Sequence, residues 1–242
     1  MVAIFFATSF VGVVTGSNSL IAVPAMFQLG IPAKTAVATN MFALLFMSAG
    51  ATIPFLRSRS IDIKRVSPLL AITFVASALG AALVGLITDQ SLKLIVSVAM
   101  ITVAVFILVK RDAGLVKPEH VSKWSLATAF VLTFLLGIYG GLYSGGYVTV
   151  LTTVLVVFFG MSFKEAVAST KLINIVSSGV AAAVFIWQGL VDFKLGIILG
   201  VTMFAAAYLG AHFATKMNDV WLKRIFLTTV FVLAIKTIYD FF

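Results

Sequence analysis

The chain has 242 residues, of which 62% are hydrophobic and only 10% are charged. Soluble domains carry about 25% charged residues, so this composition excludes a soluble enzyme, a disordered chain and a nucleic-acid-binding module, and it predicts an integral membrane protein. The formal net charge of +9 is interpreted as an orientation signal, because basic residues collect in cytoplasmic loops. The chain has no cysteine, which excludes disulfides and cysteine metal sites.

Apolar stretches follow one another along the chain, and we expect them to form eight to ten helical membrane segments. Their approximate bounds are 2–15, 19–29, 34–56, 66–87, 92–110, 124–143, 146–160, 165–187, 193–213 and 220–241. The first two are too short to cross about 30 Å of hydrocarbon at 1.5 Å per residue. We therefore expect them to be half-helices of one hairpin with a polar turn at 15–19. The pair joined at 143–146 is predicted to form a second hairpin.

The chain also repeats itself at a constant offset of 130 positions. The matches include charged loop residues, which apolar composition alone does not produce: Lys34 with Lys164, Asp62 with Asp192, Lys64 with Lys194, Asp89 with Asp219 and Lys93 with Lys223. This pattern predicts one transmembrane domain over 1–242, built from two homologous halves at about 1–110 and 124–242 with a cytoplasmic linker at 111–123.

Loop charge favours an inverted relation between the halves. Each half, a hairpin plus three transmembrane helices, crosses the membrane an odd number of times, so the second half starts on the opposite side. If the halves are inverted, one side of the membrane holds 12 basic residues and the other side holds four, which are Lys34, Lys93, Lys194 and Lys236. If the halves are parallel, the two sides hold 10 and 6 basic residues. The sharper asymmetry supports inversion. It predicts cytoplasmic loops at 57–65, 111–123, 160–164 and 214–219, with both chain ends outside.

Polar residues inside the apolar stretches are the candidates for function. Lys171 lies within 165–187, where a buried ammonium is costly and marks a functional site by default. The alternative is that its side chain snorkels to the cytoplasmic interface. Asn174 lies one helical turn further along, on the same face. The alternative for the neutral polar residues is hydrogen bonding between helices, and for the glycines close helix packing.

We expect these polar residues to meet the two hairpin turns near the bilayer midplane. Irregular backbone is tolerated at that depth only where it is buried or lines a cavity, and each turn precedes a helix N-terminus, which attracts anions. The predicted anion-binding residues are Lys171, Asn174, Ser169, Thr170, Thr39, Asn40, Ser17, Asn18, Ser19, Ser144, Gly145 and Gly146. No catalytic residue, metal ligand or cofactor is predicted.

The acidic residues support the same interpretation. All eight lie in loops or at the ends of apolar stretches, whereas a cation carrier or a carboxylate proton relay needs one inside the membrane. His212 is expected at the interface. An intramembrane serine hydrolase using Ser144 and His212 remains an alternative, although the repeat places Ala82 at the position equivalent to His212.

Four segments together resemble the sulfite exporter TauE/SafE family, over nearly the whole chain. They are GVVTGSNSLIAVP at 12–24, KTAVATNMF at 34–42, GGLYSGG at 140–146 and KEAVASTKLIN at 164–174. Family members usually carry three glycines where this chain has Ser17, Asn18 and Ser19. The resemblance implies a multi-pass protein of the cytoplasmic membrane that moves sulfite, thiosulfate, or sulfonates such as sulfoacetate.

The leading hypothesis is therefore a non-enzymatic secondary transporter, and specifically an exporter, of a small inorganic or organosulfur anion. Its partners would be this anion and the lipid bilayer, with no nucleic acid. An anion channel is the alternative within the same substrate class. The native anion, the direction of flux, proton coupling and the formation of a homo-oligomer stay open at this stage.

Overall fold

A computed structural model describes residues 2–16, 18–109 and 121–228, and these residues form helices and short connections without a β-strand. The helices are α1 (Val2–Thr15), α2 (Ser19–Gln28), α3 (Ala33–Arg57), α4 (Ile63–Leu86), α5 (Asp89–Val109), α6 (Lys123–Leu142), α7 (Tyr147–Val157), α8 (Phe163–Trp187) and α9 (Phe193–Lys216). Residues 219–228 are helical too. The predicted stretches agree with these bounds within a few residues, except that the stretch 220–241 lies outside the described residues beyond position 228. The linker 111–123 lies outside the described residues except for its last three positions.

Polar residues at equivalent positions of the two halves fix where the helices begin. The Asp62 side chain accepts a hydrogen bond from a first-turn N–H of α4, and Asp192 does the same for α9. Such caps satisfy N–H groups that have no partner within the helix. At the other ends of these helices, Lys34 Nζ donates to the carbonyl of Gly85 at 3.3 Å and Lys164 Nζ to that of Thr215 at 2.6 Å.

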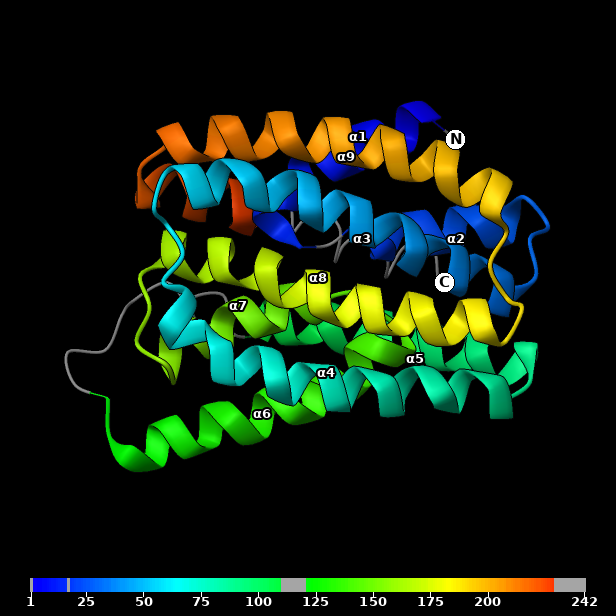
Figure 1. Cartoon of the computed structure of the whole chain (residues 1–242), viewed down its shortest axis with the longest axis horizontal. Helices are drawn as coiled ribbons and strands as arrows, with labels where there is room; N and C mark the ends of the chain where they lie inside the picture. The colour runs from blue at the N-terminus through cyan, green and yellow to red at the C-terminus, as the bar shows by residue number, and fades with distance from the viewer. Residues whose placement is uncertain (1, 17, 110–120, 229–242) are drawn as a thin grey trace.

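The long helices pack side by side as a bundle (Figure 1). α3 packs along α9 and α8 along α4, while α1 packs on α9 and α6 on α4. Glycines permit the last two contacts: a Cβ at Gly80 would lie 1.9 Å from the Ile138 carbonyl oxygen, and one at Gly210 would lie 2.4 Å from that of Phe10. Each of these pairs joins a helix of the first half to a helix of the second, and exchanging the halves converts the α3–α9 pair into α8–α4 and the α1–α9 pair into α6–α4.

Corresponding helices of the two halves run in opposite directions. Figure 1 shows α3 and α9 starting at the end of the bundle where α4 and α8 finish. Such antiparallel pairs are the geometry that an inverted duplication requires. The common origin of the halves and their orientation in the membrane stay predictions.

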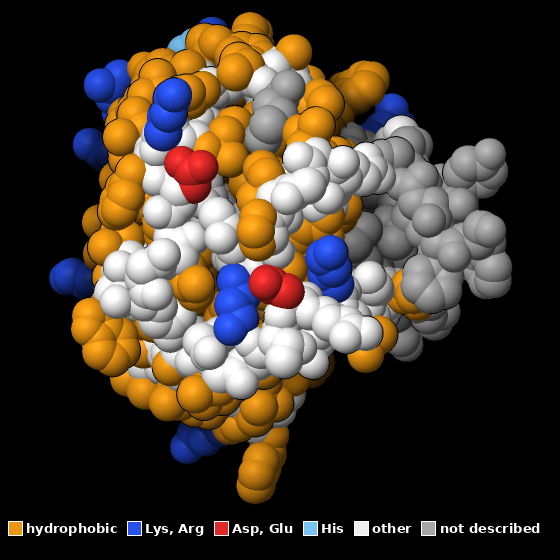
Figure 2. All heavy atoms as spheres, turned by 90° about the vertical axis from the view of Figure 1, so that its right-hand side faces the viewer, with side chains coloured by type: hydrophobic (Ala, Val, Ile, Leu, Met, Phe, Trp, Pro, Cys, Tyr) orange, Lys and Arg blue, Asp and Glu red, His pale blue; other side chains and the backbone are white. Residues whose placement is uncertain are grey.

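In the part of the chain that the structure describes, five helices are long and apolar enough to cross a membrane: α3, α4, α6, α8 and α9. Large apolar side chains cover the outside of the bundle, including Phe74, Trp124 and Val201, each more than half exposed. Figure 2 views the end at which α8 finishes, where charged and polar side chains gather and apolar ones surround them. This distribution is that of a multi-pass membrane protein, whose flanks face lipid and whose ends face water. The shorter α1, α2 and α7 have 14, 10 and 11 residues.

Candidate anion site between the two hairpin turns

The turns of the two broken helices meet inside the bundle. The α1–α2 turn passes through Gly16 at φ +70°, and the α6–α7 turn through Gly146 at φ +77°, a left-handed conformation that favours glycine. The hydroxyls of Ser19 and Ser144 are hydrogen-bonded at 2.7 Å. Thr149 Oγ1 donates to the Thr15 carbonyl at 2.6 Å. These bonds join the start of α2 to the α6–α7 turn and the start of α7 to the end of α1.

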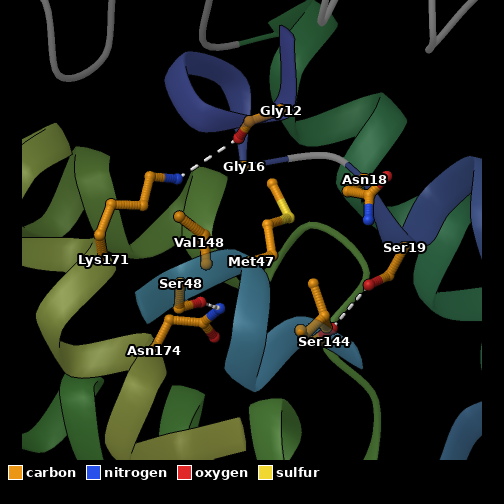
Figure 3. A pocket seen from close by; sticks show the side chains of 11 residues that line it. Gly12, Gly16, Asn18, Ser19, Met47, Ser48, Ser144, Val148, Lys171 and Asn174 are labelled. Atoms are coloured by element: carbon orange, nitrogen blue, oxygen red, sulfur yellow. Dashed lines mark hydrogen bonds between the residues drawn. The ribbon is translucent and has the colours of Figure 1, made fainter. Parts of the chain in front are cut away.

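Polar side chains of α3 and α8 approach the same place from the sides. Asn40 Nδ2 donates to Ser19 Oγ at 2.9 Å. Asn174 Nδ2 donates to Ser48 Oγ at 2.7 Å, so α8 and α3 are joined beside the turns. Lys171 Nζ donates to the backbone carbonyl of Gly12 on α1 at 3.3 Å (Figure 3).

These residues surround a small buried cavity of about 20 Å³, which is room for about one water molecule. It is lined by Gly12, Gly16, Asn18, Ser19, Leu44, Met47, Ser48, Ser144, Val148, Lys171 and Asn174. A polyatomic anion is larger than this space. Such an anion would fit only if the lining helices separated.

The electrostatics of the cavity suit an anion. The Lys171 side chain is only 3% exposed, so its ammonium acts where little water screens it. Asn18 and Ser19 stand at the N-terminus of α2, and Val148 stands at that of α7. Both helix ends carry partial positive charge. No acidic residue is among the lining residues that the structure describes.

The acidic residues of the described ranges lie elsewhere, at the ends of the bundle. Asp62, Asp89, Glu165 and Asp192 are exposed and cap or begin helices, and Asp219 is half-buried. In these ranges there is also no group of three or more His, Cys, Asp or Glu side chains that could hold a metal ion.

The structure brings five of the predicted anion-binding residues to the cavity: Lys171, Asn174, Asn18, Ser19 and Ser144. Asn40 lies one hydrogen bond behind it, on Ser19. Ser17 lies outside the described residues.

The other predicted residues are not among those that line the cavity. Thr39 Oγ1 accepts from the backbone N–H of Asp192 at 3.0 Å, and Thr170 Oγ1 donates to the Val167 carbonyl at 2.8 Å. Gly145 accepts a hydrogen bond from the Tyr139 hydroxyl through its carbonyl. Ser169 and Gly146 are buried in the neighbouring helix and turn.

The site prediction missed several lining residues, chiefly Gly12, Gly16, Met47, Ser48 and Val148. A signal for some of them is present in the sequence. Ser48 lies eight residues after Asn40, which places the two on one face of α3 with Met47 beside them. Gly16 lies within the turn predicted at 15–19, but Gly12 of α1 carries no such signal, since glycine in an apolar helix is equally typical of close packing.

A family model matches residues 1–237, which is nearly the whole chain, and its description is Sulfite exporter TauE/SafE. The chain belongs to the sulfite exporter TauE/SafE family. No solved structure matches the chain.

Curated relatives of this TauE/SafE chain agree with that assignment. A protein of Sinorhizobium sp named Probable membrane transporter protein ORF9 is 29% identical over 239 residues, covering 97% of this chain and 90% of the relative. A Probable membrane transporter protein of Haemophilus influenzae is 24% identical and covers 97% and 92%. Probable membrane transporter protein YfcA of Escherichia coli K12 is 24% identical and covers 96% and 86%. The chain is thus a multi-pass membrane transporter.

Proposed function

We propose that this TauE/SafE protein is a secondary transporter that exports a small sulfur-containing anion, such as sulfite, thiosulfate or a sulfonate like sulfoacetate. The observation that carries the proposal is the cavity at the two hairpin turns. It combines a buried ammonium, two helix N-termini and carboxamide and hydroxyl groups, without an acidic residue among its described lining. The sulfur chemistry is suggested by the family description.

Each part of the cavity has a task in binding. The Lys171 ammonium pairs with the anion's charge. The hydroxyls of Ser19, Ser48 and Ser144 and the carboxamides of Asn18 and Asn174 replace the water that the anion loses on entering. The N-termini of α2 and α7 add partial positive charge.

Transport follows from alternating access to this cavity. Because the cavity has room for only about one water, the anion passes only when the lining helices move apart, first towards one side and then towards the other. A cavity too small for the anion supports a carrier over a permanently open pore. Export needs no coupling ion, since each negative charge that leaves gains about 2.3 kcal/mol per 100 mV of inside-negative potential.

The test is flux through the purified protein in liposomes. Uptake of labelled sulfite, thiosulfate, sulfoacetate and chloride is measured with and without unlabelled anion on the opposite side. Saturable sulfur-anion uptake that is accelerated by counterflow is the expected result. Linear flux without counterflow would instead identify a channel, and absence of flux for every sulfur anion would refute the substrate class.

A further inference from the structure

Asn18 differs from the other polar groups of the cavity because its side chain has no hydrogen-bond partner among the residues that the structure describes. The side chain is 3% exposed, and both Nδ2 and Oδ1 are buried without a hydrogen bond. Leaving such a group unpaired costs free energy, and buried carboxamides in folded proteins are normally bonded. Figure 3 shows Asn18 and Lys171 on opposite sides of the cavity that both line. An orphaned group in this place indicates a contact made to the substrate.

The carboxamide also brings an acceptor to an anion site. Whichever way the amide of Asn18 is turned, it presents one N–H₂ donor and one carbonyl acceptor. Asn174 adds a second carboxamide oxygen without a partner. A fully deprotonated oxyanion offers only acceptors, so it would leave these oxygens unpaired and repel them. A ligand that carries both a negative charge and an acidic hydrogen satisfies them.

Full charges near the cavity are few. Lys171 supplies one positive charge, and α1, α2 and α7, which pack around the cavity, contain no charged residue. The charged residues of α3 and α8 other than Lys171 lie at helix ends, and they are Lys34, Arg57, Lys164 and Glu165. The Tyr143 hydroxyl is a further titratable group nearby, and it donates to the Ser19 carbonyl at 3.0 Å. A dianion carries two full negative charges against the one full positive charge of Lys171, while the two helix N-termini add about half a charge each, so the unpaired carboxamide oxygens decide between the monoanion and the dianion.

We infer that the transported species is a singly charged oxyanion that still carries an acidic O–H, hydrogensulfite in the sulfite case. This inference rests on the proposed function and specifies its substrate. Lys171 and the helix N-termini hold the charged oxygens, while Asn18 accepts a hydrogen bond from the O–H. Each turnover then moves one negative charge and one proton together. The proton is released where the anion dissociates to sulfite, so no carboxylate relay in the protein is needed.

The test compares hydrogensulfite with methanesulfinate in wild-type liposomes. Both are singly charged and similar in shape, but a methyl group replaces the O–H in methanesulfinate. We expect hydrogensulfite to be carried at least about tenfold faster, because methanesulfinate has no O–H to donate and leaves the buried carbonyl oxygen of Asn18 unpaired. We also expect its uptake to acidify a pyranine-loaded lumen beyond protein-free controls. As external pH is raised from 6 to 8.5 at constant total sulfite, flux should fall with the hydrogensulfite fraction.

The variant Asn18→Leu keeps a side chain branched at the γ carbon but has no polar group, and we expect it to carry the two anions at similar rates. Methanesulfinate keeps its single charge over this pH range. A change of its flux through the variant with pH therefore reports titration of the protein itself, and it serves as the reference. Equal rates for the two anions in the wild type, or flux that rises with the dianion fraction, would overturn the inference while leaving anion transport intact. If no sulfur anion is carried at all, the proposed function fails and this inference fails with it. The wild-type comparison does not depend on whether the variant folds.

Discussion

Replacing Lys171 by methionine separates the roles of this residue in anion binding and in stability. The side chains have similar length, but the variant loses the ammonium that now donates to the Gly12 carbonyl at 3.3 Å. For an anion at about 4 Å and an effective dielectric constant near 20, the lost attraction is about 4 kcal/mol. Since about 1.4 kcal/mol is a factor of ten in affinity, Lys171→Met should weaken anion binding about a thousandfold.

The same substitution should not destabilise the fold. Burying an ammonium costs several kcal/mol, and one carbonyl contact at 3.3 Å offsets little of this cost. We therefore expect an unchanged or higher melting temperature for Lys171→Met in detergent, measured by tryptophan fluorescence, together with loss of saturable sulfite flux in liposomes. A matched control on the same helix is Lys164→Met. It removes the bond to the Thr215 carbonyl and should lower stability by about 1 kcal/mol with anion affinity unchanged.

Two outcomes would refute this reasoning. Full flux in Lys171→Met would show that the ammonium does not contact the anion and that the site should be sought at the hairpin turns alone. Loss of flux accompanied by a large fall in melting temperature would show that Lys171 supports the fold instead.

Three further predictions address the fold. Gly80→Ala forces a Cβ against the Ile138 carbonyl and should lower the unfolding free energy by about 1–3 kcal/mol; an unchanged melting temperature would contradict the close approach of α4 and α6. Ser162→Ala removes the capping box of α8 and should cost about 1 kcal/mol in the same assay without altering flux. Because the chain has no cysteine, single substitutions report orientation: an impermeant maleimide should label Gln188→Cys in intact cells and Ser60→Cys only after permeabilisation, and the reverse pattern would exclude the predicted topology.

The helices were predictable because membrane composition leaves few alternatives. Runs of apolar residues bounded by charged, glycine or proline residues define their own ends, and the observed α2 and α7 are short, as the hairpin interpretation requires. The polar turns were predicted to meet, since unpaired backbone is not tolerated in contact with lipid. The bond between Ser19 and Ser144 shows them in contact.

The details of the cavity lining were less predictable because successive residues of a helix differ by about 100° in direction. Lys171 lines the cavity, whereas the adjacent Thr170 turns its hydroxyl back to the Val167 carbonyl. Thr39 bonds to the backbone at the start of another helix, α9. A run of polar letters does not reveal which of them faces a neighbouring helix and which faces a cavity.

The hydrogen bond between Ser19 and Ser144 constrains how the molecule can open. It joins residues that are 125 positions apart in the sequence, so it links the two halves close to the centre of the bundle. In a rotation, an atom moves in proportion to its distance from the axis. If the rotation axis passes through this bond, the two hydroxyls stay in contact while the helix ends move over larger distances. The bond then acts as a pivot and stays intact during the rotation. Opening that translates one half away from the other must break it, and would be correspondingly slower.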